Sequence, residues 1–235
     1  MTSSFFRSGA LALAALATLP AQARLVNADF SAGLAGWTTW GDATVDSTGT
    51  PAVLRLSTAY LDDADAPYNR AGVGALAAGG ADGLEVAAGL APGALDRDGH
   101  FAYEGALAQQ TFLSAAGDRL SFQWNLATRD TDFADQAFLV LNGCVIWLGS
   151  SLDAHTPAGG DMLWQTGLQS FSVALSAGPT TLSFGVVDMG DFGGVSTLQV
   201  QGLNVSAVPE PQSLALLLAG LAPLGWWVRR RQRAA

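Results

Sequence analysis

The segment TRDTDFADQ places three carboxylates, Asp130, Asp132 and Asp135, within six residues. Carboxylates at this spacing repel one another unless water or a cation screens them, and calcium prefers such oxygen ligands. Calcium takes about 6–8 oxygens, so the loop needs ligands from elsewhere, and Asp188 is the first candidate. Two interpretations stay open: a structural calcium ion held by these four residues, or an acidic loop that water solvates.

Tryptophan side chains offer a second kind of chemistry, because flat indole faces can stack on sugar rings. Trp124 and Trp147 lie in apolar runs and are predicted to be core residues. The three candidates for glycan stacking are Trp37, Trp40 and Trp164, which lie outside such runs. Packing in the core is the alternative for each of them.

Catalytic patterns are missing from the sequence. The two histidines, His100 and His155, lie in loop-like stretches, and the chain has no Gly-x-Ser-x-Gly, His-Glu-x-x-His or phosphate-loop motif. Two carboxylates distant in sequence can form a glycosidase pair, but a sequence does not reveal that geometry. Cys144 is the only cysteine and is interpreted as a buried thiol that packs as a small apolar group. We therefore expect a protein that is not an enzyme.

The charge of the chain argues against nucleic acid as a partner. All eleven basic residues are arginines, and four of them lie in the last seven positions. Residues 24–208 hold six arginines and nineteen acidic residues, which gives a formal charge of −13. A surface of this sign repels phosphate backbones, so no binding to nucleic acid is expected.

Short alternating or apolar runs between Gly, Asp and Ser clusters predict an all-β fold. Residues 119–128 alternate, with Leu120, Phe122, Trp124 and Leu126 on one face. Residues 137–149 form two apolar runs joined by Asn142-Gly143, a dipeptide typical of a tight type I′ hairpin turn. Further strands are predicted over 53–58, 180–188 and 196–207, whereas 59–106 has weaker strands and room for a short helix. The pattern favours a jelly-roll-like β-sandwich.

The N-terminus has the features of a signal peptide over residues 1–23. Arg7 precedes an apolar stretch over 9–19, and Ala21-Gln22-Ala23 has the small-x-small form of a cleavage site marked by Ala21 and Ala23. The alternative is an uncleaved N-terminal membrane anchor. Cleavage after Ala23 leaves residues 24–207 as one extracytoplasmic β-sandwich domain.

The C-terminus combines three features in order. Val208-Pro209-Glu210-Pro211 is followed by an apolar run over 213–228 and then by an arginine cluster. That cluster consists of Arg229, Arg230, Arg231 and Arg233. The run is at the lower limit of length for a transmembrane helix, and the arginines would keep its end cytoplasmic. Residues 208–233 are therefore predicted to hold a single transmembrane helix behind a stiff proline-rich spacer.

This ordered triple resembles the PEP-CTERM sorting signal of Gram-negative bacteria. The resemblance implies processing by an exosortase, a transient stay in the inner membrane, and release to the cell surface or extracellular matrix. It also implies a connection with exopolysaccharide or biofilm. A second resemblance concerns NADFSAGLAGWTTWGDATV at 27–45, which is similar to the opening of carbohydrate-binding jelly rolls.

These observations favour an exported, non-catalytic surface or matrix protein that is sorted through a PEP-CTERM signal. The first alternative is a carbohydrate-binding module that associates with exopolysaccharide. The second is a polysaccharide hydrolase. No cofactor is expected except the structural calcium ion of the first interpretation above.

The sorting signal makes a direct prediction about the mature protein. Mass spectrometry of the protein isolated from the producing bacterium is expected to find chains that end near Pro211 and lack the arginine cluster, because the exosortase cleaves at the spacer. Recovery of the arginine cluster on most molecules would contradict the prediction.

Overall fold

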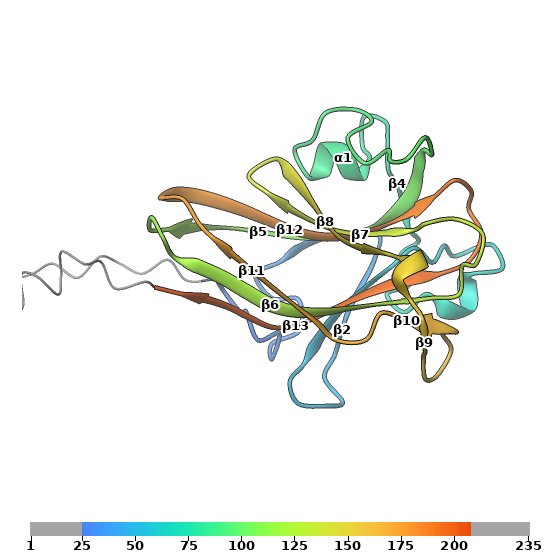
Figure 1. The fold of residues 1–235 in the computed structure, drawn as a ribbon, viewed down its shortest axis with the longest axis horizontal. Helices are drawn as coiled ribbons and strands as arrows, with labels where there is room; N and C mark the ends of the chain where they lie inside the picture. Colours follow the sequence, from blue (N-terminus) through green and yellow to red (C-terminus); the bar gives the residue numbers. More distant parts are fainter. Residues whose placement is uncertain (1–24, 208–235) are drawn as a thin grey trace, which may run out of the picture.

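The computed structural model describes residues 25–207, which form two antiparallel sheets stacked face to face (Figure 1). Sheet A has the order β1-β5-β12-β7-β8, with β4 also pairing with β5. Its strands are β1 (Thr38–Trp40), β4 (Leu76–Ala77), β5 (Ala102–Ser114), β7 (Gln136–Leu141), β8 (Cys144–Ser150) and β12 (Gly178–Met189). The all-β sandwich expected from the sequence is confirmed.

Sheet B has the order β2-β3-β13-β6-β10-β9, with β11 also pairing with β6. Its strands are β2 (Asp42–Asp46), β3 (Val53–Ser57), β6 (Arg119–Thr128), β9 (Thr156–Pro157), β10 (Trp164–Gln165), β11 (Gln169–Ala174) and β13 (Ser196–Ser206). The helical pieces are short: η1 (Ala66–Tyr68), α1 (Leu84–Ala87) and η2 (Ser151–Asp153).

The main core lies between the sheets. The predicted inward face of β6 is confirmed, because Leu120, Phe122 and Leu126 are buried there. Phe122 meets Phe184 of β12 edge to face, with ring centroids 4.9 Å apart. Aromatic pairs in this arrangement add to the stabilisation that burial alone gives, so β6 and β12 hold the two layers together.

Sheet A is also covered on its outer face. Leu84 of α1, with Ala88 and Leu95 after it, packs on Leu107 of β5 and Phe138 of β7. In Figure 1, α1 and its flanking loops lie over the strands of sheet A. The side chains on the outer face of sheet B, such as Gln123, Asn125 and Gln199, are mainly polar, so the apolar cover lies on sheet A.

The long central strand β5 was not predicted. Its inward positions include Ala106, Ala108 and Gln110, and Leu107 and Gln109 lie between them on the opposite face. Small and amide side chains give no apolar alternation, so the period of two is hidden in the sequence. The strand forms because β12 pairs with it along almost its whole length, from Gly178↔Ser114 to Met189↔Ala102.

The predicted hairpin at Asn142-Gly143 is confirmed. Leu141 pairs with Cys144, and the two turn residues have φ angles of 52° and 78°. Positive φ at both central positions is the condition for a type I′ turn. The interpretation of Cys144 as a buried thiol was wrong, because its place directly after the turn leaves the residue exposed.

The features predicted for the two ends of the chain fall outside residues 25–207, so they stay predictions. They are the signal peptide (1–23) with its cleavage site, the motif at 208–211, the transmembrane helix and the arginine cluster. Over 25–207, no helix has the length and apolar character needed to cross a membrane.

Gly185 of β12 provides a test of how tightly the outer face of sheet A is packed. A methyl group at this position would overlap the Phe138 ring. Gly185→Ala is expected to lower the free energy of unfolding by about 1–3 kcal/mol, the usual cost of overpacking. Gly49→Ala is the control, because no atom lies within 4 Å of its added methyl group. Equal midpoints for the two variants in urea unfolding would contradict the packing described here.

Candidate functional site

An open groove of about 600 Å³ crosses the outer face of sheet B. Its floor includes Arg55 of β3 and Gln199 of β13, which lie opposite each other in the strand register. Tyr68, Arg70 and Asp161 form part of its walls. A smaller hollow of about 90 Å³ continues from Arg55 and Gln199 toward Gln201 and Leu168. The groove therefore follows the polar face of the sheet.

Amide side chains form a row across this face. Asn125 of β6 donates from Nδ2 to Oε1 of Gln199 and to Oε1 of Gln165, at 3.0 Å in both cases. On the next rung, Gln201 donates from Nε2 to Oε1 of Gln123 at 3.4 Å. The row arises because alternate residues of neighbouring strands share one face. Between residues 25 and 207, Nε2 of Gln199 has no acceptor, so its two N–H groups remain free for a ligand.

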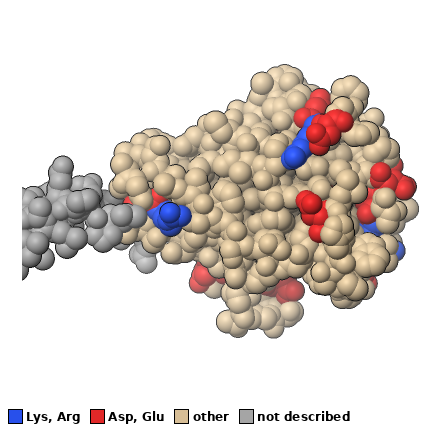
Figure 2. Space-filling view, in the orientation of Figure 1, with Lys and Arg blue, Asp and Glu red and all other residues tan. Residues whose placement is uncertain are grey.

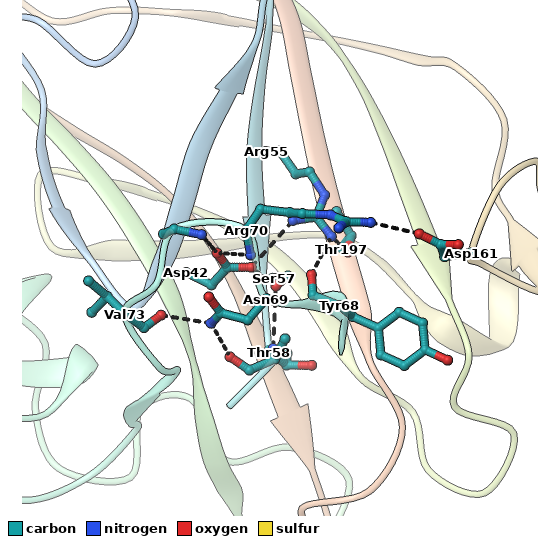
Figure 3. A network of polar contacts seen from close by, with 12 residues as sticks. Asp42, Arg55, Ser57, Thr58, Tyr68, Asn69, Arg70, Val73, Asp161 and Thr197 are labelled. Atoms are coloured by element: carbon teal, nitrogen blue, oxygen red, sulfur yellow. Dashed lines mark hydrogen bonds and ion pairs between the residues drawn. The ribbon is translucent and has the colours of Figure 1, made fainter. Parts of the chain in front are cut away.

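Asp42 anchors one side of the groove, as Figure 3 shows. Its side chain is 0 % exposed. Oδ1 accepts from the backbone N–H groups of Arg70 and Ala71, at 2.9 Å and 2.6 Å. Oδ2 accepts from the Ser57 hydroxyl and, at 3.3 Å, from Nη1 of Arg55. One buried carboxylate thus joins the β2–β3 hairpin to the loop that carries the groove wall.

Arg55 is held in place from three directions. Besides its ion pair with Asp42, it donates from Nη2 to the Tyr68 carbonyl oxygen and to the Thr197 hydroxyl, both at 3.3 Å. Burial lowers the pKa of the Arg55 guanidinium, and the charge of Asp42 acts in the opposite direction. The floor of the groove is therefore fixed in position and carries a paired charge.

The groove wall is closed by contacts between two loops. Arg70 forms an ion pair with Asp161, at 2.7 Å from Nη2 to Oδ2. Arg129 donates to the Asp161 carbonyl oxygen at 2.5 Å, and its guanidinium lies over the Tyr68 ring, 4.9 Å from the centroid. These side chains are more exposed than Asp42, so their contacts shape the surface and add less to stability.

The candidates for glycan stacking are not gathered in this groove. Trp37 is 8 % exposed and packs against Phe30 and Phe184 in the main core, a placement that does not fit the predicted stacking role. Trp40 is half-buried and packs beside the cluster under α1. Trp164 is 42 % exposed on β10, toward the edge of sheet B. It is the one candidate of the three that presents a large part of its surface to solvent.

The predicted calcium ligands lie at one end of the sandwich. Asp130, Asp135 and Asp188 are buried there, whereas Asp132 is exposed on the same loop. Burial is the main reason that the pKa of Asp135 and that of Asp188 are raised. Figure 2 shows acidic side chains at this end of the surface, on the right. No three His, Cys, Asp or Glu side chains within 25–207 are already arranged as a metal site.

Sequence analysis missed the groove residues because strand register decides which of their side chains are neighbours. Arg55 is the polar residue in VLRLS, and Asp42 lies beside it only because β2 pairs with β3. An arginine on the polar face of a predicted strand was the available indication. The acid that neutralises it could not be identified without the pairing.

Comparisons with known proteins find similarity in solved structures alone. No protein-family model and no curated protein sequence matches the chain. The carbohydrate-binding module TmCBM61, solved with β-1,4-galactotriose, has a TM-score of 0.40 at 10 % identity, covering 78 % of this chain and 97 % of that one. CBM28, specific for non-crystalline cellulose, has a TM-score of 0.35 at 11 % identity over 78 % of this chain and 94 % of its own. A CBM4 structure has a TM-score of 0.32 at 10 % identity, over 78 % and 99 %. At these values the functional argument rests on the groove itself.

The Asp42 network predicts that two acidic residues of the groove differ greatly in importance for stability. Asp42→Asn places an amide N–H₂ against Arg55 or against backbone donors and is expected to cost about 3 kcal/mol of unfolding free energy. Asp161→Asn breaks an exposed ion pair and is expected to cost less than about 1 kcal/mol. Urea unfolding followed by tryptophan fluorescence measures both. Similar losses in the two variants would refute the anchoring role of Asp42.

Proposed function

We propose that this chain is an exported carbohydrate-binding protein that holds a polysaccharide in the groove on the outer face of sheet B. The observation that carries the proposal is the row of side-chain amides on that face, in which Gln199 lines the groove and Gln201 lines the smaller hollow beside it. This was the first alternative to the main interpretation of the sequence. The groove favours it because it supplies a binding surface that a purely structural matrix protein would not need.

The chemistry of the row suits sugar hydroxyls. Each amide offers both N–H donors and a carbonyl acceptor, and each hydroxyl both donates and accepts. A planar amide can therefore bind two neighbouring hydroxyls of one sugar ring. The exposed side chain of Leu168 and the Tyr68 ring add apolar surface beside these polar groups. Binding sites of this kind combine a few fixed polar groups with apolar contact area.

Binding is favoured over hydrolysis at this groove by the state of its carboxylates. Asp46 accepts from the hydroxyl and the backbone N–H of Thr48, and these bonds lower its pKa. Asp161 is paired with Arg70. A glycosidase needs one carboxylic acid that stays protonated near neutral pH, which requires a raised pKa. Asp46 does not meet that requirement, and the carboxylate of Asp161 is engaged by the Arg70 guanidinium.

The proposed location follows from the ends of the chain. The signal peptide and the PEP-CTERM-like tail support export to the surface or matrix of a Gram-negative bacterium, where exosortase and exopolysaccharide are the proposed partners. The antiparallel strand order, with sequence neighbours split between the two sheets, supports the finer description of the fold as jelly-roll-like.

The proposal is tested with the full-length chain, purified in detergent, on a glycan array and by affinity electrophoresis in bacterial exopolysaccharide. Retention by at least one β-linked polysaccharide is expected. Gln199→Ala is expected to weaken binding about tenfold, since a hydrogen bond of this type contributes about 1 kcal/mol or more.

Thr111→Ala is the matched control, because Thr111 lies exposed on sheet A and contacts only Thr181 among the side-chain hydrogen bonds. It should bind as the wild type does. Absence of binding to every glycan, or equal weakening by both substitutions, would sink the proposal. Release of new reducing ends from a bound polysaccharide would favour the hydrolase instead.

A further inference from the structure

A layer of polar side chains closes the core at one end of the sandwich. In β6, β12 and β13, the inward positions next to this end are apolar until the last one, which is polar. Thus Phe184 and Val186 of β12 are followed by Asp188. The six residues of the layer are Thr58, Glu104, Thr128, Asp135, Asp188 and Ser196, and all are buried. We call this set the polar layer.

Asp188 is the unusual member of the polar layer. It is 1 % exposed, and neither of its carboxylate oxygens has a hydrogen-bond partner. Oε1 of Glu104, on the neighbouring strand β5, also lacks a partner. A buried, ionised carboxylate without a partner is strongly destabilising, so such a group takes up a proton or binds a partner in native proteins. The missing partner must lie between the sheets, because the alternation of β12 directs Asp188 inward.

The rest of the polar layer forms no hydrogen bond with Asp188. Asp135 already accepts from the Met189 N–H at 2.9 Å and from the Ser196 hydroxyl at 2.6 Å. The Ser196 hydroxyl also lies 2.8 Å from that of Thr128. The Ser196 and Thr128 hydroxyls are therefore engaged with each other and with Asp135, while the Thr58 hydroxyl oxygen accepts from the Ser196 N–H at 3.0 Å.

Within residues 25–207, no arginine forms an ion pair with a member of the polar layer. The charge of Arg129 acts to lower the pKa of the nearby Asp65. The guanidinium of Arg129, however, lies over the Tyr68 ring, outside the polar layer. Instead, further acids surround the layer, and the charges of Asp135, Asp191 and Asp130 all act on Asp188. Burial and acidic neighbours raise the pKa of Glu104 to about 7. This end of the sandwich thus gathers buried acidic groups, and no ion pair among the described residues reaches them.

Two partners could stabilise this arrangement: protons or a metal cation. One proton on Asp188 would neutralise that carboxylate and give one donor for one neighbouring acceptor, and it would leave the other buried acids without a counter-charge. A cation satisfies both oxygens at once and neutralises the neighbouring acids as well. The bare oxygens of Asp188 and Glu104 therefore favour the cation.

We propose that a calcium ion binds between the two sheets in the polar layer, with the carboxylates of Asp188 and Asp135 as its protein anchors and Glu104 beside them. The polar layer contains oxygen ligands only, which suits a hard cation and excludes the nitrogen and sulfur sets that zinc prefers. Calcium tolerates irregular ligand positions and completes its shell with water or backbone carbonyl oxygens, whereas magnesium demands a near-ideal octahedron.

The site differs in part from the loop predicted from the sequence. Asp135 and Asp188 keep their role, while Asp130 accepts backbone N–H bonds from Asp132 and Phe133 within its own loop. Asp132 is exposed and takes no part, and Glu104 replaces it. The proposal is independent of carbohydrate binding, because the groove lies on the outer face of sheet B and the polar layer lies between the sheets.

The test uses the full-length chain in detergent, stripped with EDTA and then titrated with calcium or magnesium chloride. Thermal unfolding is followed by tryptophan fluorescence, and bound metal is counted by elemental mass spectrometry. Calcium at about a hundredfold excess over its Kd is expected to raise the Tm by roughly 5–10 °C, with about one ion per chain and a weaker response to magnesium.

Asp188→Asn gives the sharpest variant, because it removes the unpaired charge while it keeps the shape. In EDTA its Tm is expected to exceed that of the wild type, and its response to calcium should be lost. Asp118→Asn is the matched control: Asp118 is also buried, but it precedes β6 at the opposite end of that strand and accepts from the Ala115 N–H at 2.9 Å. It should keep the full calcium shift.

Glu104→Gln provides a second variant in case Asp188→Asn does not fold, and a reduced calcium shift is expected from it. The proposal is overturned if the wild type shows neither a calcium-dependent Tm nor bound metal. It is equally overturned if Asp188→Asn, or in its place Glu104→Gln, keeps the full shift. Loss of the shift in Asp118→Asn as well would assign the effect to general charge screening and would also overturn it.

Discussion

The apolar cover that residues 78–95 place over sheet A is the constraint on which the rest of the molecule depends. Leu84 and Leu95 pack on the outer face of β5 and β7, so the part of sheet A beneath them is buried on both sides. The outer face of sheet B has no comparable apolar cover within 25–207, and its residues are arginine, glutamine and asparagine in place of leucine. A sandwich of two sheets thus acquires one structural layer and one layer that faces solvent.

Two buried carboxylates, one beside the groove and one in the polar layer, have very different surroundings. Asp42 is fully satisfied by backbone N–H groups, a hydroxyl and Arg55, and it fixes the groove wall. Asp188 is as deeply buried and has no partner. The same chemical group is therefore fully hydrogen-bonded in one place and without a partner in the other. One is a completed structural anchor, and the other points to a ligand that is not part of the polypeptide.

The sequence predicted the parts of the fold that local patterns determine. Alternation over 119–128 and the Asn142-Gly143 turn were both recognised, because each depends on neighbouring residues only. The strand β5 was missed because alanine and glutamine face inward there. The pairing of Asp42 with Arg55 was missed because it depends on register between strands. Acid clustering was predicted, but the inward place of Glu104 required the three-dimensional arrangement.

The direction of β13 gives the molecule a polarity. The strand begins at Ser196, beside the polar layer, and ends at Ser206, next to Arg119 at the other end of β6. With about 3.3 Å per residue, its eleven residues span roughly 35 Å. If the sandwich is attached through the chain that follows Ser206, the polar layer lies at the end of the domain farthest from the attachment point. Neighbouring molecules on one surface would then present the same negatively charged tips outward and the same grooves along their flanks.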